Sequence, residues 1–395
     1  MKQLLLAIVL FCSFTLSAQN NAYKNSADNL LIKDSKLTIG GYGEAHYNKA
    51  LDGDTYSNAK LDVHRLVMLL GYNFSDRVKF VSELEFEHVK EVYVEQAFLQ
   101  FKLNEYINFR GGLMLTPMGI INEYHEPTTF NGVERPLVDK YLAPTTWREL
   151  GFGVSGNIIS SSIKYQAYIM GGFNGYDGSA KFSGSNGLRK GRQKGAEAFS
   201  TTPAFTGKVE YYGIKGLNVG LSTYIGKTST TLYNGLSKDD KVAKAQADSS
   251  VVGIAMVGTD FRYRNNGLIL RGQFYYNSLS NTDEYNQFTA KDGKNNDLGK
   301  AMMGYYLDAG YNVLQSCNKT EMELIPFVRY EYSNTQYKME EGFAANPKND
   351  KTAITTGLTL KLTKGVVVKS DIQFLKSDAD DSYSKTLNMG IGVTF

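Results

Sequence analysis

The sequence predicts an all-β fold, a transmembrane antiparallel β-barrel of about 16 strands with an inward-folded constriction loop. Three observations favour this class. Segments of about 10 residues alternate apolar and polar side chains, as tilted membrane-spanning strands do. The connections between these segments are alternately short and long. The chain also contains 27 tyrosines, 21 phenylalanines and 39 glycines, a composition typical of barrels with aromatic girdles.

Residues 1–18 have the features of a secretory signal peptide, which is absent from the mature chain. Lys2 supplies the positive start, residues 4–16 are apolar, and Ala18 is a small residue at the expected cleavage position. A lipoprotein anchor at Cys12 is the competing interpretation, but bulky Phe11 stands where a small residue is needed. Removal of the leader leaves Cys317 as the single cysteine, so no internal disulfide is expected.

Residues 19–36 are polar, rich in asparagine and without a period, which predicts a flexible periplasmic N-terminal segment. The barrel is expected over residues 37–395. Its last strand shows the pattern clearly, because Met389, Ile391 and Phe395 share one face while small and polar residues share the other. The candidate strands begin near Leu37, Leu61, Val78, Glu91, Ile107, Leu150, Ile163, Ala204, Leu217, Val251, Leu268, Ala301, Met322, Thr352, Val366 and Ser384.

An even number of strands places both ends of the barrel on the periplasmic side, with the short turns there and the long loops outside. Two segments break the alternation. The apolar side changes face around Arg65, and residues 91–103 have a mixed pattern. A β-bulge and a misplaced strand boundary are the two explanations.

Composition excludes two other classes of protein. The chain has 43 basic and 40 acidic residues among 395, and this balance argues against a nucleic-acid-binding protein. No run of about 18 apolar residues follows the leader, so a helical membrane protein is excluded.

Residues 116–149 form the candidate constriction loop. A barrel of about 16 strands is too wide for its own side chains to fill, so it holds a water-filled channel unless a loop enters it. This segment carries four of the seven prolines, together with His125 and the only tryptophan, Trp147. Such a rigid, aromatic segment favours a loop folded into the lumen, and an exposed surface loop is the alternative.

In this region the sequence resembles the phosphate-selective porin family. The resemblance rests on residues 117–123 and 133–136 and on Phe130, Arg148 and Gly151. Residues 39–44 and 61–65 are similar to the first strands of related outer-membrane proteins of Bacteroidota. Membership implies a trimeric or monomeric outer-membrane channel for small anions or other hydrophilic solutes. The pore-constriction candidates are Glu123, Glu126, Glu134, Arg135, Arg148 and Glu149.

Alternation also assigns charged residues to the lumen. The lumen-lining candidates are Glu44, Arg110, Lys164, Lys208, Arg271 and Lys369. Lumenal strand positions carry a small basic excess, whereas the loop has three basic residues against five acidic ones. Because a phosphate-specific filter needs a ladder of fixed donors, this balance argues against one and leaves a weak anion preference.

A second long connection, residues 174–203, is strongly basic. It contains Lys181, Arg189, Lys190, Arg192 and Lys194, and its only acids are Asp177 and Glu197. At the cell surface such a loop draws anions toward the mouth or contacts phosphates of the outer leaflet. A solvated loop without a role is the alternative.

His46, His64 and His88 on neighbouring strands are weak metal-ligand candidates, since imidazole and carboxylate both bind divalent cations. Glutamates lie close by in the sequence at positions 83, 85, 87, 91 and 95. Ion pairs of these acids with Arg65, Lys79 and Lys90 are the favoured interpretation. No spacing matches a compact metal motif, so no metal and no cofactor are expected.

These features predict an outer-membrane channel through which small hydrophilic solutes or ions diffuse passively. The alternative is an accessory or scaffold barrel of an outer-membrane assembly or secretion complex. No enzyme is expected, because no histidine stands beside a serine pattern that a hydrolase needs. The expected partners are outer-membrane lipid and lipopolysaccharide, with a homotrimer or other outer-membrane proteins as alternatives and no nucleic acid.

Overall fold

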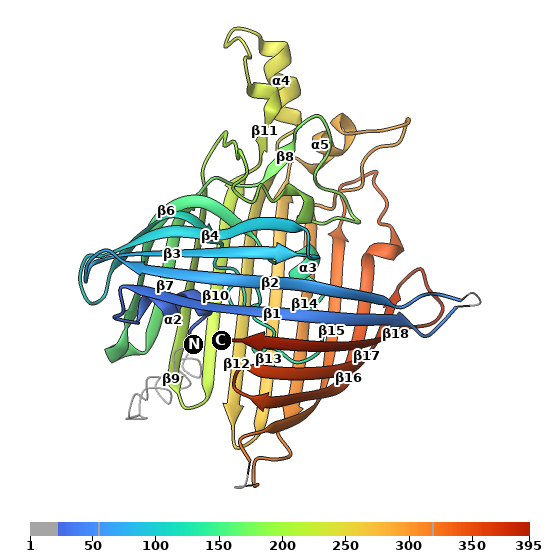
Figure 1. Cartoon of the computed structure of the whole chain (residues 1–395). Helices are drawn as coiled ribbons and strands as arrows, with labels where there is room; N and C mark the ends of the chain where they lie inside the picture. Colours follow the sequence, from blue (N-terminus) through green and yellow to red (C-terminus); the bar gives the residue numbers. More distant parts are fainter. Residues whose placement is uncertain (1–22, 54–55, 318–319) are drawn as a thin grey trace, which may run out of the picture.

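A closed antiparallel barrel dominates the computed structural model, which describes residues 23–53, 56–317 and 320–395 (Figure 1). The expected signal peptide lies outside these residues. Within them, sixteen strands close the barrel in the order β1-β18-β17-β16-β15-β14-β13-β12-β10-β9-β7-β6-β5-β4-β3-β2. The barrel class predicted from the alternation is therefore confirmed.

The strand bounds follow the predicted segments closely. The barrel strands are β1 (Leu37–Ala50), β2 (Lys60–Asn73), β3 (Val78–Glu87), β4 (Glu91–Lys102), β5 (Asn108–Leu115), β6 (Arg148–Ile158), β7 (Ile163–Met170), β9 (Ala204–Ile214), β10 (Leu217–Lys227), β12 (Gly253–Asn265), β13 (Leu268–Ser280), β14 (Ala301–Tyr311), β15 (Glu323–Lys338), β16 (Asp350–Thr363), β17 (Val366–Ser377) and β18 (Ser384–Thr394). The strands β8 (Asn174–Tyr176) and β11 (Ser229–Thr230) pair in parallel outside the barrel sheet. The helices are α2 (Ser26–Leu31), α3 (Val138–Tyr141), α4 (Lys241–Ser249) and α5 (Thr282–Phe288), with 3-10 turns η1 (Ile159–Ser161), η2 (Arg189–Gly191), η3 (Thr231–Tyr233) and η4 (Pro347–Asn349).

The two-residue period sorts side chains into an outward apolar face and an inward polar face. On β18, Met389 and Ile391 are 48% and 57% exposed, while Asn388 is buried. On β10, Leu221 and Ile225 are exposed while Ser222 is buried. An outward apolar surface of this kind is stable only against hydrocarbon, which explains why strands of modest apolarity suffice. None of the described helices is both long and apolar enough to cross a membrane.

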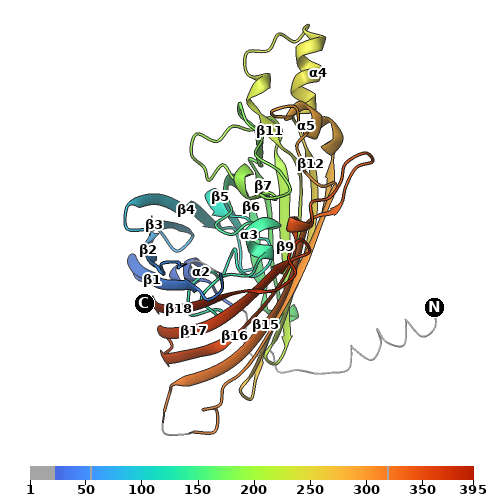
Figure 2. The ribbon, with the colours of Figure 1, turned by 90° about the vertical axis from the view of Figure 1, so that its right-hand side faces the viewer.

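The two ends of the barrel differ in their connections. Tight connections such as residues 74–77, 215–216 and 364–365 lie at one end, here called the turn end, where β1 begins and β18 ends. Long connections lie at the opposite end, here called the loop end, which carries α4 and α5 (Figure 2). The connections sort by length as the sequence predicts, except for the short turn of residues 88–90 at the loop end and the longer connection of residues 312–322 at the turn end.

Both irregular segments contain a β-bulge. Glu44 pairs with Arg65 and Ala45 pairs with Val63, so His64 is an extra residue on β2. On β4, Glu95 is extra in the same way, because Leu84 and Glu83 of β3 pair with Val94 and Gln96. A bulge brings two successive side chains to one face, so the bulge explanation holds and the strand boundaries are correct.

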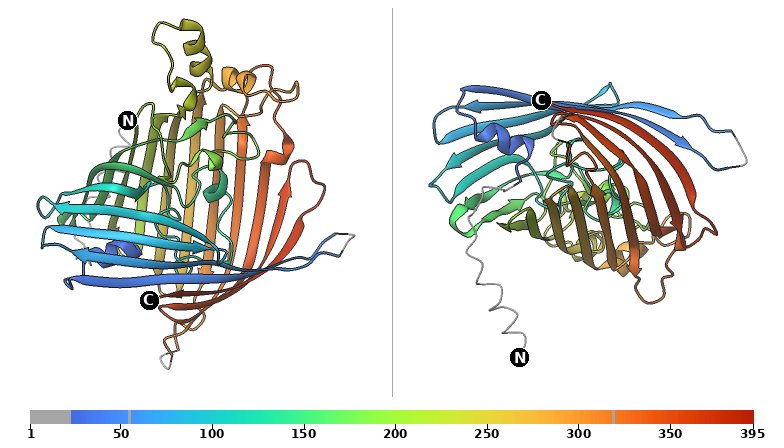
Figure 3. Two further views of the ribbon diagram at one scale, coloured as in Figure 1. Left: turned by 45° about the horizontal axis from the view of Figure 1, so that its top comes forward. Right: turned by 90° about the horizontal axis from the view of Figure 1, so that it is seen from below.

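The N-terminal segment differs from the expectation of flexibility over residues 19–36. Asn25 caps α2 by accepting a 2.8 Å hydrogen bond from the Asp28 amide. Ala27, Leu30 and Leu31 are buried against inward apolar side chains of β1 to β5 and β7. Figure 3 shows α2 on the inner side of the wall made by β1 to β4. A six-residue helix has no detectable period in the sequence, and it is stabilised by this burial.

The loop end of the lumen contains a hydrophobic cluster of loop and wall residues. Trp147 stacks on Phe173 at 4.5 Å between ring centroids and contacts Tyr224 of β10. Met118 and Leu142 of the inward loop join them and are fully buried. This packing holds the connection between β5 and β6 and the connection between β7 and β9 together inside the barrel.

Candidate functional site

The connection between β5 and β6 crosses the lumen and binds the opposite wall. Its backbone amides donate to wall side chains: Ile120 to Gln273 Oε1 at 2.6 Å, Val133 to Asp371 Oδ2 at 2.7 Å and Leu137 to Glu331 Oε2 at 2.6 Å. The acceptors lie on β13, β17 and β15. Three wall strands therefore fix the path of this loop, and the inward fold expected from its prolines and aromatic residues is confirmed.

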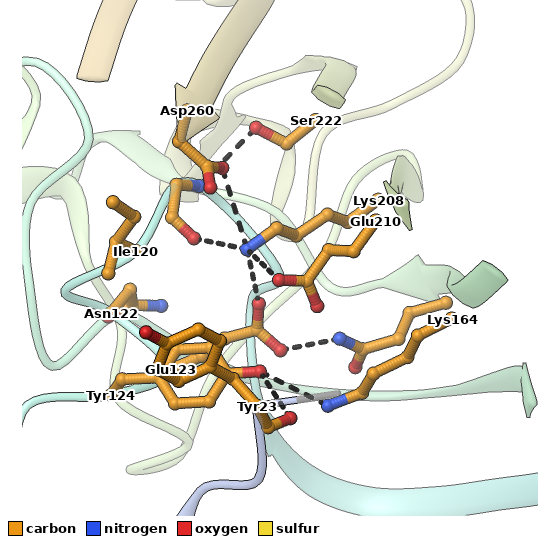
Figure 4. A network of polar contacts seen from close by, with 12 residues as sticks. Tyr23, Ile120, Asn122, Glu123, Tyr124, Lys164, Lys208, Glu210, Ser222 and Asp260 are labelled. Atoms are coloured by element: carbon orange, nitrogen blue, oxygen red, sulfur yellow. Dashed lines mark hydrogen bonds and ion pairs between the residues drawn. The ribbon is translucent and has the colours of Figure 1, made fainter. Parts of the chain in front are cut away.

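A buried charge cluster around Lys208 fastens the loop to β9 and β12 (Figure 4). Lys208 Nζ lies 3.0 Å from Glu123 Oε2 of the loop and 3.6 Å from both Glu210 and Asp260. Arg262 also pairs with Glu210. All of these side chains are buried. Glu123, a constriction candidate, therefore anchors the loop instead of facing open lumen.

Glu126 serves as a cap for α2. Its Oε1 accepts hydrogen bonds from the Ser26 amide at 2.8 Å and from Ser26 Oγ at 2.6 Å. On the other side of this helix, Asp28 pairs with Lys164 at 2.6 Å and with Arg110 at 3.4 Å. These ion pairs lower the pKa of Asp28 although its burial raises it. The helix and the loop are thus tied to each other and to β5 and β7.

A second buried cluster surrounds His125. Its Nε2 lies 2.8 Å from Tyr42 Oη and 3.7 Å from Glu95, the bulge residue of β4. Burial lowers the pKa of His125, but Glu95 and Glu83 raise it to about 9. His125 is therefore an imidazolium at neutral pH. Arg148 Nη1 lies 3.9 Å from the same Glu95 and is 2% exposed, so this constriction candidate also belongs to a buried network.

Glu149 is buried at the start of β6. Its carboxylate accepts a 2.7 Å hydrogen bond from Trp147 Nε1 and another of 2.7 Å from the Gly172 amide. It joins the two connections that fill the loop end.

Glu134 and Arg135 are the constriction candidates that are not buried. The side chain of Glu134 is 41% exposed, and its Oε1 accepts a 3.0 Å hydrogen bond from Asn48 and lies 3.4 Å from His46 Nδ1. Burial acts to raise the pKa of Glu134, but the hydrogen bond with His46 lowers it to about 2. Glu134 is therefore a fixed negative charge.

The structure places the six lumen-lining candidates on the inner wall, where most are neutralised. Glu44 lies 2.8 Å from Arg65 Nε, and Arg271 donates to the Thr129 carbonyl of the loop. Lys369 Nζ lies 3.9 Å from the ring centroid of Phe130 and makes no hydrogen bond within the described residues. Arg110 and Lys164 hold Asp28, and Lys208 holds Glu123, as described above.

Two cavities have only basic residues among their charged lining residues, although Arg262 in one of them pairs with Glu210 and Arg264 pairs with Glu323. At the loop end, a cavity of about 450 Å³ is lined by Lys140, Tyr141, Ser185, Asn186, Arg189, Lys190, Arg192 and Lys194. Nearer the turn end, a cavity of about 240 Å³ includes Arg262, Arg264, Arg271, Lys361 and Lys24 in its lining. Neither lining contains an acidic residue in the described part of the chain. Burial and the neighbouring Arg189 and Arg148 lower the pKa of Arg192 to about 9.

The sequence identified most of the basic residues that line the cavity at the loop end, but it did not indicate that Lys140 of the inward loop lies beside them. Arg189, Lys190, Arg192 and Lys194 come from the connection singled out for its charge, whereas Lys140 belongs to the inward loop. The residues are some 50 positions apart in the chain, and only tertiary packing brings them together. The Leu188 amide donates to the Tyr141 carbonyl at 3.0 Å, which joins the two loops directly.

The histidine candidates divide into two groups. His64 and His88 both face Asp62, whereas the nitrogens of His46 face Glu44 at 3.3 Å and Glu134. The expected ion pairs with the strand glutamates hold for Arg65, which lies 3.5 Å from Glu85. Lys79 differs from that expectation, because it donates to the Leu31 carbonyl at 2.7 Å.

The chain is similar to proteins of one described family. Residues 40–321 match the family described as phosphate-selective porin O and P. An uncharacterized protein of Aquifex aeolicus (strain VF5) is 32% identical over 357 residues, which cover 87% of this chain and 76% of that protein.

Solved structures share the barrel. OmpF of Salmonella typhi, solved with daunomycin, matches with a TM-score of 0.56 at 14% identity, covering 91% of this chain and 97% of that chain. The trimer form of in-vitro folded OmpT, an outer membrane protein of Vibrio cholerae, matches with a TM-score of 0.52 at 10% identity, covering 91% and 99%. At these identities the likeness shows the fold alone.

Proposed function

Because the chain belongs to the phosphate-selective porin O and P family, we propose that it forms a channel for passive diffusion of small hydrophilic solutes and ions, with a preference for anions. Family and fold together make it an outer-membrane β-barrel porin without enzymatic activity. The similarity of its first strands to Bacteroidota proteins stays a prediction. In this setting the turn end is periplasmic and the loop end extracellular.

The observation that carries the anion preference is the pair of basic cavities on either side of the inward loop. Arginine and lysine at a low-dielectric mouth concentrate anions locally and repel cations. The charges deeper in the lumen are largely paired with carboxylates, as at Lys208 and Arg65. A passing anion therefore meets basic groups without a carboxylate partner among the described residues at both ends, Lys140 and Lys190 at one and Arg271 and Lys361 at the other. The wall between them is neutralised, which supports general anion preference without phosphate specificity.

We also propose that Glu134 and Arg135 line the narrowest passage. They are the partly exposed charged residues of the loop segment that faces β1, and the other four constriction candidates hold buried networks. Oppositely charged groups at one constriction produce a transverse field that orders water and polar solutes. The variant Glu134→Gln removes the negative member and is expected to strengthen the anion preference.

The deciding experiment is the single-channel current of the refolded mature chain in planar bilayers under a potassium chloride gradient. Open channels with a reversal potential toward the chloride equilibrium value are expected, and the Glu134→Gln variant is expected to move further in that direction. A verified folded barrel without current contradicts the channel. A cation-selective potential contradicts the role of the basic mouths.

A plugged accessory barrel is the second candidate function, favoured by one observation. The inward loop is packed almost throughout, with Met118, Val138 and Trp147 fully buried. A barrel whose lumen serves as a rigid core suits a scaffold subunit of an outer-membrane complex. Copurification of a constant set of partners from native membranes, together with silent bilayers, supports this role. Purification of this chain alone opposes it.

A homotrimer is the assembly we propose for the channel. The similar structure of in-vitro folded Vibrio cholerae OmpT is a trimer form of that protein. Outer-membrane lipid and lipopolysaccharide are the expected neighbours of the remaining outward face. Light scattering of the detergent-solubilised chain measures the number of copies directly.

A further inference from the structure

Three side chains at the loop end of the β1 to β3 wall form a compact set of metal ligands. We propose that Asp62, His64 and His88 bind a divalent transition-metal ion of the zinc class. One ligand atom from each residue lies within 4.8 Å of the others. This site is separate from both basic cavities, and the proposal does not depend on whether the barrel conducts.

The distances between the ligand atoms suit a small ion. His88 Nδ1 lies 2.8 Å and His64 Nδ1 lies 3.5 Å from the same oxygen, Asp62 Oδ2. Ligands bound at about 2.0–2.2 Å in a tetrahedron are separated by about 3.3–3.6 Å, so both distances between a histidine and the carboxylate lie near those that a bound ion requires.

The backbone places these rings together by two unusual local features. His64 is the extra residue of the β2 bulge, which adds it to the lumenal face beside Asp62. His88 lies in the turn between β3 and β4 with φ of 53°, and Val89 follows with φ of 69°. A β-branched residue in the left-handed region is an outlier, and such a conformation persists only where the surrounding structure holds it. The His88 amide lies 3.5 Å from the His64 carbonyl and joins the turn to β2.

The donor set selects the class of ion. Two imidazoles and one carboxylate suit zinc, copper or nickel, whereas magnesium and calcium prefer oxygen ligands alone. Three protein ligands leave at least one coordination position for water. The side chains of His64 and His88 are 31% and 35% exposed and that of Asp62 is 12% exposed, so an ion reaches the site from solvent.

The surroundings leave these ligands free to bind. Lys60 Nζ is 3.6 Å from Asp62, but its side chain is 69% exposed and a metal ion displaces it at little cost. His46 stacks on His64 with ring centroids 4.7 Å apart and an angle of 11°. Because both nitrogens of His46 face carboxylates, we do not count it among the ligands of the ion.

Another group of metal-binding residue types, Glu83, Glu95 and His125, is completely buried. Arg148 already neutralises Glu95, and Tyr42 occupies His125 Nε2. This cluster offers an ion neither access nor an unshared nitrogen. The variants below change Asp62 or His88 and leave this buried cluster intact, so they distinguish zinc binding at the exposed site from binding at the cluster.

The test is zinc binding by isothermal titration calorimetry to the refolded mature chain without a histidine tag. Wild type is expected to bind one Zn²⁺ per chain and no Mg²⁺. His88→Asn suits the left-handed turn and removes one ligand, and it is expected to lower zinc affinity by at least about tenfold, as is Asp62→Asn. His46→Gln is the matched control and is expected to keep tight one-to-one binding.

Each alternative result overturns the site. Wild type without stoichiometric zinc binding contradicts it, as does a His88→Asn variant that binds as tightly as wild type. Loss of binding in His46→Gln with retention in Asp62→Asn also contradicts it. Circular dichroism of each variant verifies the β-barrel before titration, so a folding failure is not counted as a binding result.

Discussion

At the scale of single residues, charged side chains in this lumen mainly form ion pairs that hold the inward loop to the barrel wall. Lys208 is the central example, since it joins Glu123 of the loop to Glu210 and Asp260 of the wall. A buried charge is tolerated only when it is compensated, so each of these groups depends on the others. The alternation in the sequence assigned Lys208 to the lumen, but its partners come from segments distant in the chain.

Truncation of Lys208 is therefore expected to destabilise the protein. Lys208→Ala leaves three carboxylates around a cavity and is expected to lower the free energy of unfolding by about 3–5 kcal/mol, the usual cost of breaking a buried ion pair. Urea unfolding of the refolded barrel measures the change. Lys238→Ala removes an exposed lysine and is the matched control. Equal stability of the two variants contradicts the fastening role.

The buried carboxyl group of Asp139 is expected to make the stability of the protein depend on pH. Burial raises the pKa of this carboxyl to about 8, although the hydrogen bond from Gln273 lowers it. The folded state thus holds the proton more tightly than the unfolded chain. The stability that protonated Asp139 contributes is complete below about pH 4 and is lost as the pH rises through about 8.

Asp139→Asn is expected to remove this dependence, since asparagine does not titrate and still accepts the bond from Gln273 Nε2. Between about pH 5 and pH 8 the free energy of unfolding should fall more steeply in wild type than in the variant. Urea titrations at several pH values compare the two slopes. Parallel slopes contradict a raised pKa at Asp139.

At the scale of elements, the inward loop is an insertion between two strands that pair without it. β5 and β6 form a continuous antiparallel ladder from Asn108 with Ser155 to Leu115 with Arg148. The pairing of β5 with β6, which closes this part of the barrel wall, therefore does not depend on the residues of the inward loop. The loop adds the anchors at Val133 and Leu137 and the short helix α3.

Deletion of residues 128–140 is expected to widen the lumen and raise single-channel conductance, because it removes these anchors together with Glu134 and Arg135. Deletion of residues 237–246, which include most of α4, shortens a loop of similar length far from the lumen and is the control. Unchanged conductance after the first deletion places the narrow passage in another element.

At the scale of the whole molecule, basic side chains gather around two cavities, one toward each end of the barrel, although the net charge is only +3. The preference for anions that we propose therefore rests on the spatial distribution of charge and not on its total. Lys140 of the inward loop and Lys190 of the basic connection are both exposed and line the same cavity at the extracellular mouth.

Charge reversal at this mouth is expected to weaken the selectivity. Lys140→Glu combined with Lys190→Glu should shift the reversal potential toward potassium, and the shift should shrink at high salt because exposed charges are screened. Lys241→Glu combined with Lys244→Glu on α4 makes the same change in net charge away from the cavity. An equal shift in both pairs contradicts a local effect of the mouth.

The sequence by itself determined the barrel, its strand boundaries, the inward and outward faces of its strands and the inward loop. These follow from the two-residue period, from the alternation of connection lengths and from the clustering of proline and Trp147, all of which are local in the chain. The sequence also predicted that the side chains of Lys208 and Lys369 face the lumen, because this too follows from the two-residue period.

Only the tertiary structure decided what each lumenal charge contacts. It placed α2 inside the barrel, converted Glu123, Glu126, Arg148 and Glu149 from expected pore residues into buried anchors, and left Glu134 and Arg135 partly exposed. It also turned two irregular strands into bulges that add His64 and Glu95 to the inner face. The physical reason is that ion pairing and burial depend on segments far apart in the sequence, whereas the strand pattern depends only on neighbours along the chain.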